Sequence, residues 1–487
     1  MEKVFFCGIK GTGMSNLALI LQRMGYEVSG CDKKDFYSTQ NKLYDSNINI
    51  FESFNKDNID LNIKFFIYSS AYEKSELVEY SKLKYECFSY PQFLARLTKN
   101  NKSYAVCGTH GKTTVSALTT YALSQGKRKK FPFFSIYGSN IIGEDDVCFQ
   151  GVDNILIEGC EYQDHFLLYK TDGILITNIE FDHPDYFKDL NLMIESYKKL
   201  ILNVKQSGFV ILNTDNYNSS KLEAFIKGSR ADLILITYGY KKIATVSIEN
   251  TINGGEVIIP MIYRSSYKLP VRNKDLMANY VGAGILSSCI LLDRENPNLY
   301  LDENAIIFEE ILITLFNQSM EYLQDFTGVS RRLEFISGDG DVLYFDDYAH
   351  HPTEIETVYN ELRFRFPTKQ ILTIFTPHTA SRTKAMMNDF VRALMMGDKL
   401  ILTPTFSSAR ENCNLNDPSF VLFNRIQGKI DKSKLYSLNS VYYLGSDEDF
   451  IKRSCMEMTS NYICLILGAA NKTYLIDEII KFRTKNS

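Results

Sequence analysis

Short apolar runs alternate with amphipathic segments along the 487 residues of the chain. The run KVFFCGI (3–9) has the pattern of a buried strand, and SNLALILQRMGY (15–26) has apolar positions at helical spacing. Comparable strand, turn and helix units recur as far as YICLILGAAN (462–471). Because strands that alternate with helices are typical of parallel sheets, the pattern predicts an α/β fold.

Polar breaks in this pattern indicate where one domain ends and the next begins. The length alone favours about three domains. The run TKNNKS (98–103) predicts the first boundary, and the composition changes again near Gly328. We therefore predict domains at residues 1–102, 103–327 and 328–487.

A glycine-rich turn follows the first predicted strand. It carries Gly8, Gly11 and Gly13, and Asp32 follows the second strand. The order G-x-x-G-x-G differs from the G-x-G-x-x-G of nicotinamide-binding domains. The glycines alone leave two interpretations open, a diphosphate-binding turn and a tight turn without a ligand.

The segment VCGTHGKTTVS (106–116) predicts a phosphate-binding loop between a strand and a helix. Glycines let backbone N–H groups approach phosphate oxygens, and a helix N-terminus adds positive potential. Lys112 supplies a mobile charge, and Thr113 offers a hydroxyl to Mg²⁺. The loop is shorter than the common G-x-x-x-x-G-K-[ST] form.

Polar residues stand at the ends of the strands predicted after this loop. NILIEGCEY, GILITNIEFDHPDYF and GFVILNTDN each run from apolar residues into acids, an asparagine or a histidine. The carboxyl ends of parallel strands line the crevice in which ligands bind. We therefore expect Glu158, Asn178, Asp182 and His183 to face the phosphates held by the loop.

Charge and cysteine content exclude several classes of protein. With 54 basic and 58 acidic residues, nothing indicates nucleic acid as a partner. The start MEKVFFCGIKG fails as a signal peptide, and we expect no later stretch to be long enough to span a bilayer, so a cytoplasmic location is expected. Ten cysteines without a C-x-x-C pair favour reduced thiols over a disulfide framework or a zinc site.

Histidines are few and concentrated in motifs. Five of the six stand at predicted strand ends or turns: His110, His183, His350, His351 and His378. None forms an H-E-x-x-H pair, which disfavours a tightly held zinc. An oxygen-rich Mg²⁺ site with one imidazole is the better expectation.

Together the motifs resemble one known family. GIKGTGM, GCD, YSSA, GTHGKTT, EGCEY, NIEFDH, GVSRRLEF, DDYAHHPTEI, FTPHTASRT, FSSARE and GAAN have the order and spacing of the UDP-N-acetylmuramate:L-alanine ligases of bacterial cell-wall synthesis. The resemblance covers nearly the whole chain. It implies a Rossmann-like N-terminal domain for the UDP-sugar, a central P-loop ATPase-type domain, and a C-terminal Rossmann-like domain for the amino acid.

The resemblance also implies an activity. Such ligases (EC 6.3.2.8) use ATP, with Mg²⁺ or Mn²⁺, to convert the carboxylate of UDP-N-acetylmuramate into an acyl-phosphate that L-alanine attacks. It further implies a protein that binds neither nucleic acid nor a membrane and is a monomer or a weak homodimer.

Roles for individual residues follow from the same resemblance. The implied catalytic residues are Lys112, Glu158, His183 and Arg382, and the implied metal ligands are Thr113, Glu158 and His183. The implied nucleotide contacts are Gly108, Thr109, His110, Gly111, Lys112, Thr113, Thr114, Asn279, Arg332 and Asp347, with Asn279 at the adenine. The implied substrate contacts are Gly11, Gly13 and Ser15 at the diphosphate, Asp32, Ser69 and Ser70 at the uridine end, and Asn178, His351, His378 and Arg382 at the carboxylate and alanine.

Several positions depart from the family pattern. In EGCEYQ, Cys160 and Gln163 replace two acids. Leu276 stands where an asparagine is usual, and Thr379 replaces a frequent arginine. Lys198 lies near the position of a modified lysine in some relatives, and we interpret it as a surface residue.

Other functions remain open from the sequence. A recycling ligase that joins a whole tripeptide to the same UDP-sugar shares most motifs, and EGCEY with NIEFDH favours it, whereas PHTASRT and FSSARE favour a single amino acid. Glycine or L-serine could replace L-alanine. A nucleotide-binding oxidoreductase or a non-catalytic binding protein would leave Lys112, Glu158 and His183 without a task.

Overall fold

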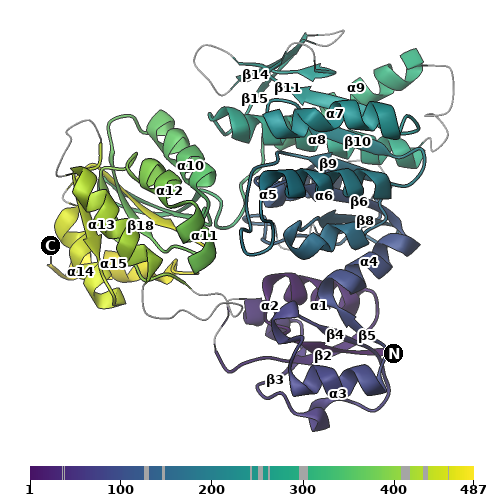
Figure 1. Ribbon diagram of the computed structural model, residues 1–487, viewed down its shortest axis with the longest axis horizontal. Coiled ribbons are helices and arrows are strands. Elements are labelled where there is room, and N and C mark those ends of the chain that lie inside the picture. The colour runs from purple at the N-terminus through teal and green to yellow at the C-terminus, as the bar shows by residue number, and fades with distance from the viewer. Residues whose placement is uncertain are drawn as a thin grey trace. The chain divides into compact units, whose positions relative to one another are not determined.

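The structure is a computed structural model, shown in Figure 1. It describes residues 1–35, 37, 39–125, 131–144, 148–241, 244–250, 256–260, 264–295, 305–406, 417–430, 437–458 and 460–486. They form two compact units. The first comprises Met1–Phe181, Asp189–Pro270 and Ala278–Phe326, and the second Asp182–Lys188, Val271–Met277 and Thr327–Ser487.

The first sheet of the first unit has five parallel strands in the order β3-β2-β1-β4-β5. These strands are β1 (Lys3–Cys7), β2 (Glu27–Cys31), β3 (Asn49–Phe51), β4 (Ile63–Tyr68) and β5 (Cys87–Ser89). Its helices are α1 (Thr12–Arg23), α2 (Thr39–Asp45), α3 (Glu76–Lys84) and α4 (Tyr90–Asn100), with short 3₁₀ turns η1 (Lys56–Asn58) and η2 (Ser70–Tyr72). The strand order reverses between β1 and β4, which is where sheets of this kind bind ligands.

The second sheet of this unit has seven parallel strands in the order β12-β11-β10-β9-β6-β8-β7. They are β6 (Lys102–Cys107), β7 (Phe133–Ile136), β8 (Asn154–Glu158), β9 (Gly173–Ile176), β10 (Phe209–Asn213), β11 (Ile234–Gly239) and β12 (Val246–Ser247). The helices are α5 (Lys112–Ser124), η3 (Tyr162–Leu168), α6 (Leu190–Asn203), α7 (Tyr217–Ser229), α8 (Lys274–Glu295) and α9 (Ala305–Leu323). Because β6 lies between β8 and β9, the loop that follows β6 is flanked by the ends of both neighbours.

A small antiparallel sheet follows β12. Its strands are β13 (Glu249–Asn250), β14 (Glu256–Pro260) and β15 (Arg264–Lys268).

The sheet of the second unit has the order β16-β17-β21-β18-β19-β20, in which β16 is antiparallel to β17 and the other pairs are parallel. Its strands are β16 (Glu334–Asp339), β17 (Val342–Asp347), β18 (Gln370–Phe375), β19 (Lys399–Leu402), β20 (Ser440–Tyr443) and β21 (Tyr462–Leu467). The helices are α10 (Pro352–Arg365), α11 (Ala380–Ala385), α12 (Met387–Leu394), α13 (Pro418–Ile430), α14 (Asp447–Glu457) and α15 (Tyr474–Asn486). The FSSARE motif starts at Phe406 and continues outside the described residues.

The α/β fold predicted from the sequence is confirmed. The expectation that no stretch could span a bilayer is wrong by length and composition, because Lys274–Asp293 of α8 is a 20-residue segment with a mean hydropathy of 1.4. However, 78% of that segment is buried inside the protein. Its apolar composition is therefore that of a core helix.

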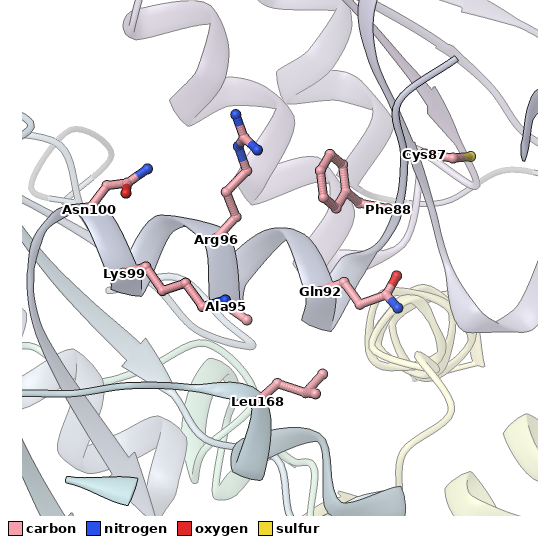
Figure 2. A pocket seen from close by; sticks show the side chains of 8 residues that line it. All are labelled: Cys87, Phe88, Gln92, Ala95, Arg96, Lys99, Asn100 and Leu168. Carbon is pink, nitrogen blue, oxygen red and sulfur yellow. The ribbon is translucent and has the colours of Figure 1, made fainter. Parts of the chain in front are cut away.

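A hollow of about 670 Å³ lies where α4 faces Leu168 at the end of η3, as Figure 2 shows. Its lining residues are Cys87, Phe88, Gln92, Ala95, Arg96, Lys99, Asn100 and Leu168. None of the predicted site residues belongs to this lining, so the candidate site lies elsewhere in the fold.

Candidate active site

The predicted phosphate loop connects β6 to α5 and depends on two glycines. Gly108 has φ +133° and Gly111 has φ +81°, values that other residues rarely adopt. A Cβ on Gly108 would lie 2.0 Å from the Thr177 hydroxyl, and one on Gly111 would lie 2.9 Å from the Asn279 amide oxygen. The loop is therefore packed so closely that only glycine fits at these two positions.

Residues that follow β9 hold the loop in place. The His110 N–H donates to Asn178 Oδ1 (2.9 Å), and the Asn178 amide donates back to the His110 carbonyl (3.1 Å). The Thr177 hydroxyl donates to the same carbonyl (2.6 Å), and the Thr109 hydroxyl donates to the Glu180 carbonyl (3.0 Å). Asn178 thus fixes the shape of the loop.

Lys112 folds back over the loop from the start of α5. Its ammonium donates to the carbonyls of Gly108 (2.5 Å) and Thr109 (3.0 Å) and to Glu161 Oε1 (3.0 Å). Burial lowers the pKa of Lys112, but the negative charges of Glu161 and Glu158 outweigh it and hold that pKa above its ordinary value. The lysine is therefore a fixed positive charge at the loop.

Thr113 and Glu158 meet beside the loop. The Thr113 hydroxyl lies 3.1 and 3.0 Å from the two Glu158 carboxylate oxygens, and the Gly138 N–H donates to Glu158 Oε2 (3.1 Å). A hydroxyl and a carboxylate are oxygen donors of the kind that Mg²⁺ prefers. These two residues fit the predicted metal site, and Thr114 follows them in the first turn of α5.

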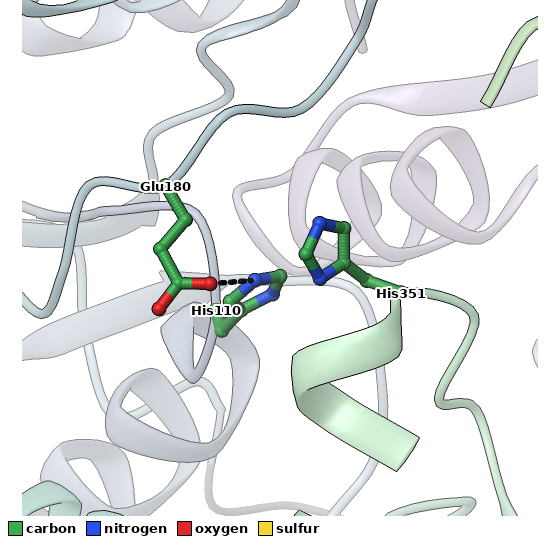
Figure 3. Close-up of side chains that lie close together, drawn as sticks. All are labelled: His110, Glu180 and His351. Carbon is green, nitrogen blue, oxygen red and sulfur yellow. Dashed lines mark ion pairs between the residues drawn. The ribbon is translucent and has the colours of Figure 1, made fainter. Parts of the chain in front are cut away.

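Two further predicted residues border the loop. His110 Nε2 lies 3.5 Å from Glu180 Oε2, an ion pair when the imidazole is protonated, as Figure 3 shows. Asn279 on α8 is buried, with its side-chain amide against Gly111. The structure thus brings the loop, Glu158, Asn178 and Asn279 together.

Asp32 lies at the carboxyl end of the first sheet. Its carboxylate accepts from the backbone N–H groups of Lys10 (2.7 Å) and Lys33 (2.8 Å) and from the Tyr72 hydroxyl (2.9 Å). Gly8, with φ +86°, would place a Cβ 2.7 Å from the Tyr72 ring. Asp32 therefore organises the turn after β1.

The remaining predicted residues of this domain surround the same strand ends. Gly11 is the N-cap of α1, and a Cβ on Gly13 would lie 2.7 Å from the Tyr90 hydroxyl. The Ser15 hydroxyl donates to the Thr12 carbonyl (3.0 Å). Ser69 caps η2 directly after β4, with Ser70 next to it.

In the second unit, Asp182 and Arg382 form a buried ion pair. Arg382 Nε donates to Asp182 Oδ1 (2.7 Å) and Nη2 donates to Oδ2 (3.1 Å). Burial raises the pKa of Asp182, but Arg382 and His183 outweigh it and hold that pKa well below its usual range. Arg382 Nη1 lies 3.4 Å from His378 Nδ1. His183 has φ +53°, and its N–H donates to Asp182 (2.7 Å).

Two adjacent histidines precede α10. Burial lowers the pKa of His350 to about 3, so that ring is neutral. Its Nδ1 lies 3.0 Å from the Tyr348 carbonyl and therefore carries the proton. His351 is the N-cap of α10, and its Nδ1 accepts from the Thr353 N–H (3.3 Å), which leaves the proton on Nε2.

Asp347 ends β17 with both carboxylate oxygens occupied by the N–H groups of Leu333 and Ala349 (each 2.6 Å). Burial raises the pKa of Asp347 to about 7, although Arg332 opposes that rise. Arg332 also lies over the Tyr348 ring, 5.1 Å from its centre. Arg332 and Asp347 are thus neighbours, as their predicted common role requires.

The raised pKa of Asp347 predicts a pH-dependent stability. Between about pH 4, where the unfolded carboxyl titrates, and about pH 7, the folded state binds a proton that the unfolded chain releases. The residue's contribution to stability is therefore lost as the pH rises through this window, by on the order of 4 kcal/mol in total. We expect the thermal midpoint of the wild type to fall relative to that of Asp347→Asn from about pH 5 to about pH 8. Parallel curves for the two proteins would contradict this.

The sequence did not indicate three side chains that hold predicted site residues or motifs in place. Glu161, the second acid of EGCEY, holds Lys112. Asp182 pairs with Arg382, a partner that the motifs did not indicate. Arg331 donates to the carbonyls of Gly468 (2.6 Å), Ala469 (3.2 Å) and Ala470 (2.9 Å), so it holds the closing GAAN motif.

The positions that depart from the family pattern are accommodated locally. Gln163 (φ +54°) lies in the turn after Glu161, and Thr379 (φ +65°) is the N-cap of α11. Lys198 on α6 pairs with Glu195 (2.7 Å). Cys160 carries an exposed free thiol.

Comparison with known proteins gives the chain a family. Three family profiles match it in succession: "Mur ligase family, catalytic domain" at 3–102, "Mur ligase middle domain" at 106–286 and "Mur ligase, glutamate ligase domain" at 331–470. The UDP-N-acetylmuramate--L-alanine ligases of Borrelia garinii subsp. bavariensis and Borreliella burgdorferi are each 30% identical to the chain over 98% of both chains. The chain belongs to the Mur ligase family. Its three α/β domains are those of a Mur ligase.

Solved Mur ligase structures share the fold. UDP-N-acetylmuramate-alanine ligase MurC from Thermotoga maritima is 20% identical, with a TM-score of 0.74 and 100% of both chains covered. A murein peptide ligase from Psychrobacter arcticus is 17% identical, with a TM-score of 0.69, and 99% of this Mur ligase and 98% of that chain are covered.

Proposed function

We propose that this Mur ligase joins L-alanine to the lactyl carboxylate of UDP-N-acetylmuramate at the expense of ATP, in the synthesis of peptidoglycan precursors. The curated relatives at 30% identity are ligases of that name. The middle domain of a Mur ligase binds ATP. The observation that carries the proposal is the loop itself, where a fixed Lys112 charge and the Thr113–Glu158 oxygens lie together at the start of α5.

The chemistry requires such a site. An amine cannot displace oxide from a carboxylate at a useful rate, so ATP first converts the carboxylate into an acyl-phosphate. In the proposed mechanism Lys112 stabilises the charge that develops during phosphoryl transfer, and Thr113 and Glu158 would hold Mg²⁺. A bound Mg²⁺ neutralises phosphate charge. Gly108 and Gly111 would present backbone N–H groups to the phosphates, whereas the N–H groups of Thr109 and His110 donate to Asn178.

Residues of the second unit would bind the amino acid and the nucleotide. Asp182 occupies the Nε and Nη2 edge of Arg382, so the Nη1 side, next to His378, is the one we assign to the alanine carboxylate. A planar guanidinium held in this way leaves the amine of alanine free to attack. We assign His351 to the substrate carboxylate and His183 to the further metal ion. Arg332 and Asp347 are assigned to the nucleotide.

The first domain would bind the UDP moiety. Gly11, Gly13 and Ser15 begin α1, whose N-terminus suits a diphosphate. Asp32, Ser69 and Ser70 lie at the neighbouring strand ends, where we place the uridine. Because ATP and nucleotide sugars are found in the cytoplasm, the proposed activity fits a cytoplasmic location. The prediction that the protein is a monomer or a weak homodimer stays a prediction.

The tripeptide ligase is the second candidate. A ligase of that kind from Neisseria meningitides is 21% identical, with a TM-score of 0.54, and 68% of this chain is covered, a likeness that concerns the fold alone. The curated relatives at 30% identity favour the single amino acid.

An isotope experiment tests the proposed intermediate. When the lactyl carboxylate is labelled with oxygen-18, attack of alanine on an acyl-phosphate leaves one labelled oxygen in the released phosphate. We expect mass spectrometry to detect this label in phosphate, and no label in ADP. Unlabelled phosphate from a reaction that still forms the amide would contradict the proposal.

The oxygen donors at Thr113 and Glu158 predict a dependence on Mg²⁺. We expect activity to need millimolar Mg²⁺ or Mn²⁺, because hard oxygen ligands select such ions. EDTA should abolish ligation, and added Mg²⁺ should restore it. If a zinc-selective chelator removed the activity and zinc alone brought it back, the assignment of the metal site would be wrong.

A further inference from the structure

Glu161 contacts the lysine of the phosphate loop from a different structural element. It lies in the turn between β8 and η3, 49 residues along the chain from Lys112. Lys112 Nζ is 3.0 Å from Oε1 and 2.9 Å from Oε2 of Glu161. The side chains are only 13% and 2% exposed, respectively, so water screens this pair little.

The contacts of Lys112 use its whole capacity for hydrogen bonds. A lysine ammonium has three N–H donors. Here they meet the carbonyls of Gly108 and Thr109 and the carboxylate of Glu161. A phosphate oxygen can therefore bind Lys112 only by displacing an acceptor. The two carbonyls belong to the loop itself, so the separate carboxylate of Glu161 is the group that a phosphate would replace.

The backbone around Glu161 is fixed by two hydrogen bonds. The Asp164 N–H donates to the Glu161 carbonyl (3.0 Å), and the Phe166 N–H donates to the Cys160 carbonyl (2.9 Å). Phe166 is fully buried, with its ring centre 5.1 Å from that of Tyr197 on α6. The turn that carries Glu161 is therefore anchored by contacts that do not involve Lys112.

Glu158 and Glu161 have separate partners. Glu158 contacts the Thr113 hydroxyl and the Gly138 N–H, whereas Glu161 contacts Lys112. Burying two opposite charges gains little stability relative to apolar residues, although removing one partner of such a pair is strongly destabilising. Stability alone is therefore a weak reason for a carboxylate at this position.

We propose that Glu161 is a positioning residue whose carboxylate holds the Lys112 ammonium over the phosphate loop until a nucleotide phosphate takes the place of that carboxylate. By competing with phosphate for Lys112, Glu161 limits how tightly the nucleotide is bound. The inference rests on the proposed function, because it requires a nucleotide at this loop. It adds a residue whose effect on nucleotide affinity can be measured without turnover.

Binding of ADP to Glu161→Gln is the decisive experiment. Glutamine has the same shape, but it lacks the charge that competes with phosphate. By titration calorimetry we expect ADP to bind about tenfold more tightly than to the wild type, the effect of losing one competing charge-assisted contact. The matched control is Glu195→Gln, which removes an exposed charge of the same domain that pairs with Lys198 (2.7 Å), and it should change the affinity by less than about twofold.

The outcomes separate the inference from the proposed function. Unchanged or weaker ADP binding by Glu161→Gln, or an equal gain in Glu195→Gln, would overturn the role of Glu161. A wild-type protein that binds no ADP would overturn the proposed function and this inference with it. In steady-state assays Glu161→Gln should lower both KM for ATP and kcat, whereas a merely structural role would not lower KM.

Thermal unfolding tests the coupling of Lys112 and Glu161 in variants that bind nucleotide poorly. Lys112→Ala leaves the Glu161 carboxylate buried without its ammonium partner, so its thermal midpoint should fall. Adding Glu161→Gln to that variant should recover part of the loss. If the double variant were less stable than Lys112→Ala alone, the two side chains would not be coupled, and the inference would fail.

Discussion

Lys112→Ala is expected to abolish ATP-dependent ligation while UDP-N-acetylmuramate still binds. The ammonium is the fixed positive charge of the phosphate loop, and loss of one such group typically costs about 10²–10³-fold in kcat. The UDP-sugar is assigned to the first domain, whereas the groups that Lys112 contacts, on Gly108, Thr109 and Glu161, belong to the second. Phosphate release should therefore disappear while calorimetry detects the UDP-sugar at nearly unchanged affinity.

The matched control for this prediction is Lys198→Ala. Lys198 is a lysine of the same domain, and its ammonium pairs with Glu195 on the surface of α6. This variant should keep wild-type turnover. Unchanged turnover in Lys112→Ala would remove the phosphate loop from the mechanism.

Arg382→Lys is expected to weaken the apparent affinity for L-alanine. Lysine keeps the charge but loses the planar group that binds Asp182 through two nitrogens. Loss of a charge-assisted hydrogen bond to the alanine carboxylate would cost on the order of 1.5–3 kcal/mol. That cost is a rise in KM for L-alanine of about 10- to 150-fold. Initial-rate series in each substrate should show near wild-type values for ATP and UDP-N-acetylmuramate.

Arg363→Lys is the corresponding control in the same domain. Arg363 on α10 bridges Asp398 (2.8 Å) and the carbonyls of Lys369 and Met396 (each 3.1 Å), away from the predicted site. This substitution should lower stability and leave the alanine dependence unchanged. If Arg382→Lys weakened all three substrates equally, Arg382 would be a structural residue. If it spared alanine and impaired a peptide substrate, the tripeptide ligase would be the better assignment.

Local chemistry made the phosphate loop predictable from the sequence. Gly108 and Gly111 occur where the backbone needs positive φ and close approach, and the strand before them is a continuous apolar run. Glu158 could be placed at a strand end because the apolar pattern of NILIE stops there. Such features depend on a few neighbouring residues, so the sequence shows them directly.

Long-range pairings could not be predicted in the same way. Arg382 and Asp182 are 200 residues apart, and nothing in either motif indicates that they meet. The pairing of Lys112 with Glu161 depends on the turn after β8, where Gln163 and Asp164 adopt positive φ without a glycine to signal it. By length and composition helix α8 could be a buried helix or a membrane span, since both are apolar, and only the surrounding core distinguishes the two.

The most direct test of the account is a substrate panel for phosphate release. Purified protein, ATP and Mg²⁺ would be mixed with UDP-N-acetylmuramate and, separately, L-alanine, glycine, L-serine or the tripeptide, and each product identified by mass spectrometry. We predict phosphate release that requires the UDP-sugar and is fastest with L-alanine, with one alanine joined to the lactyl carboxylate. Release supported by the tripeptide alone, or by no acceptor in the panel, would contradict the proposed function.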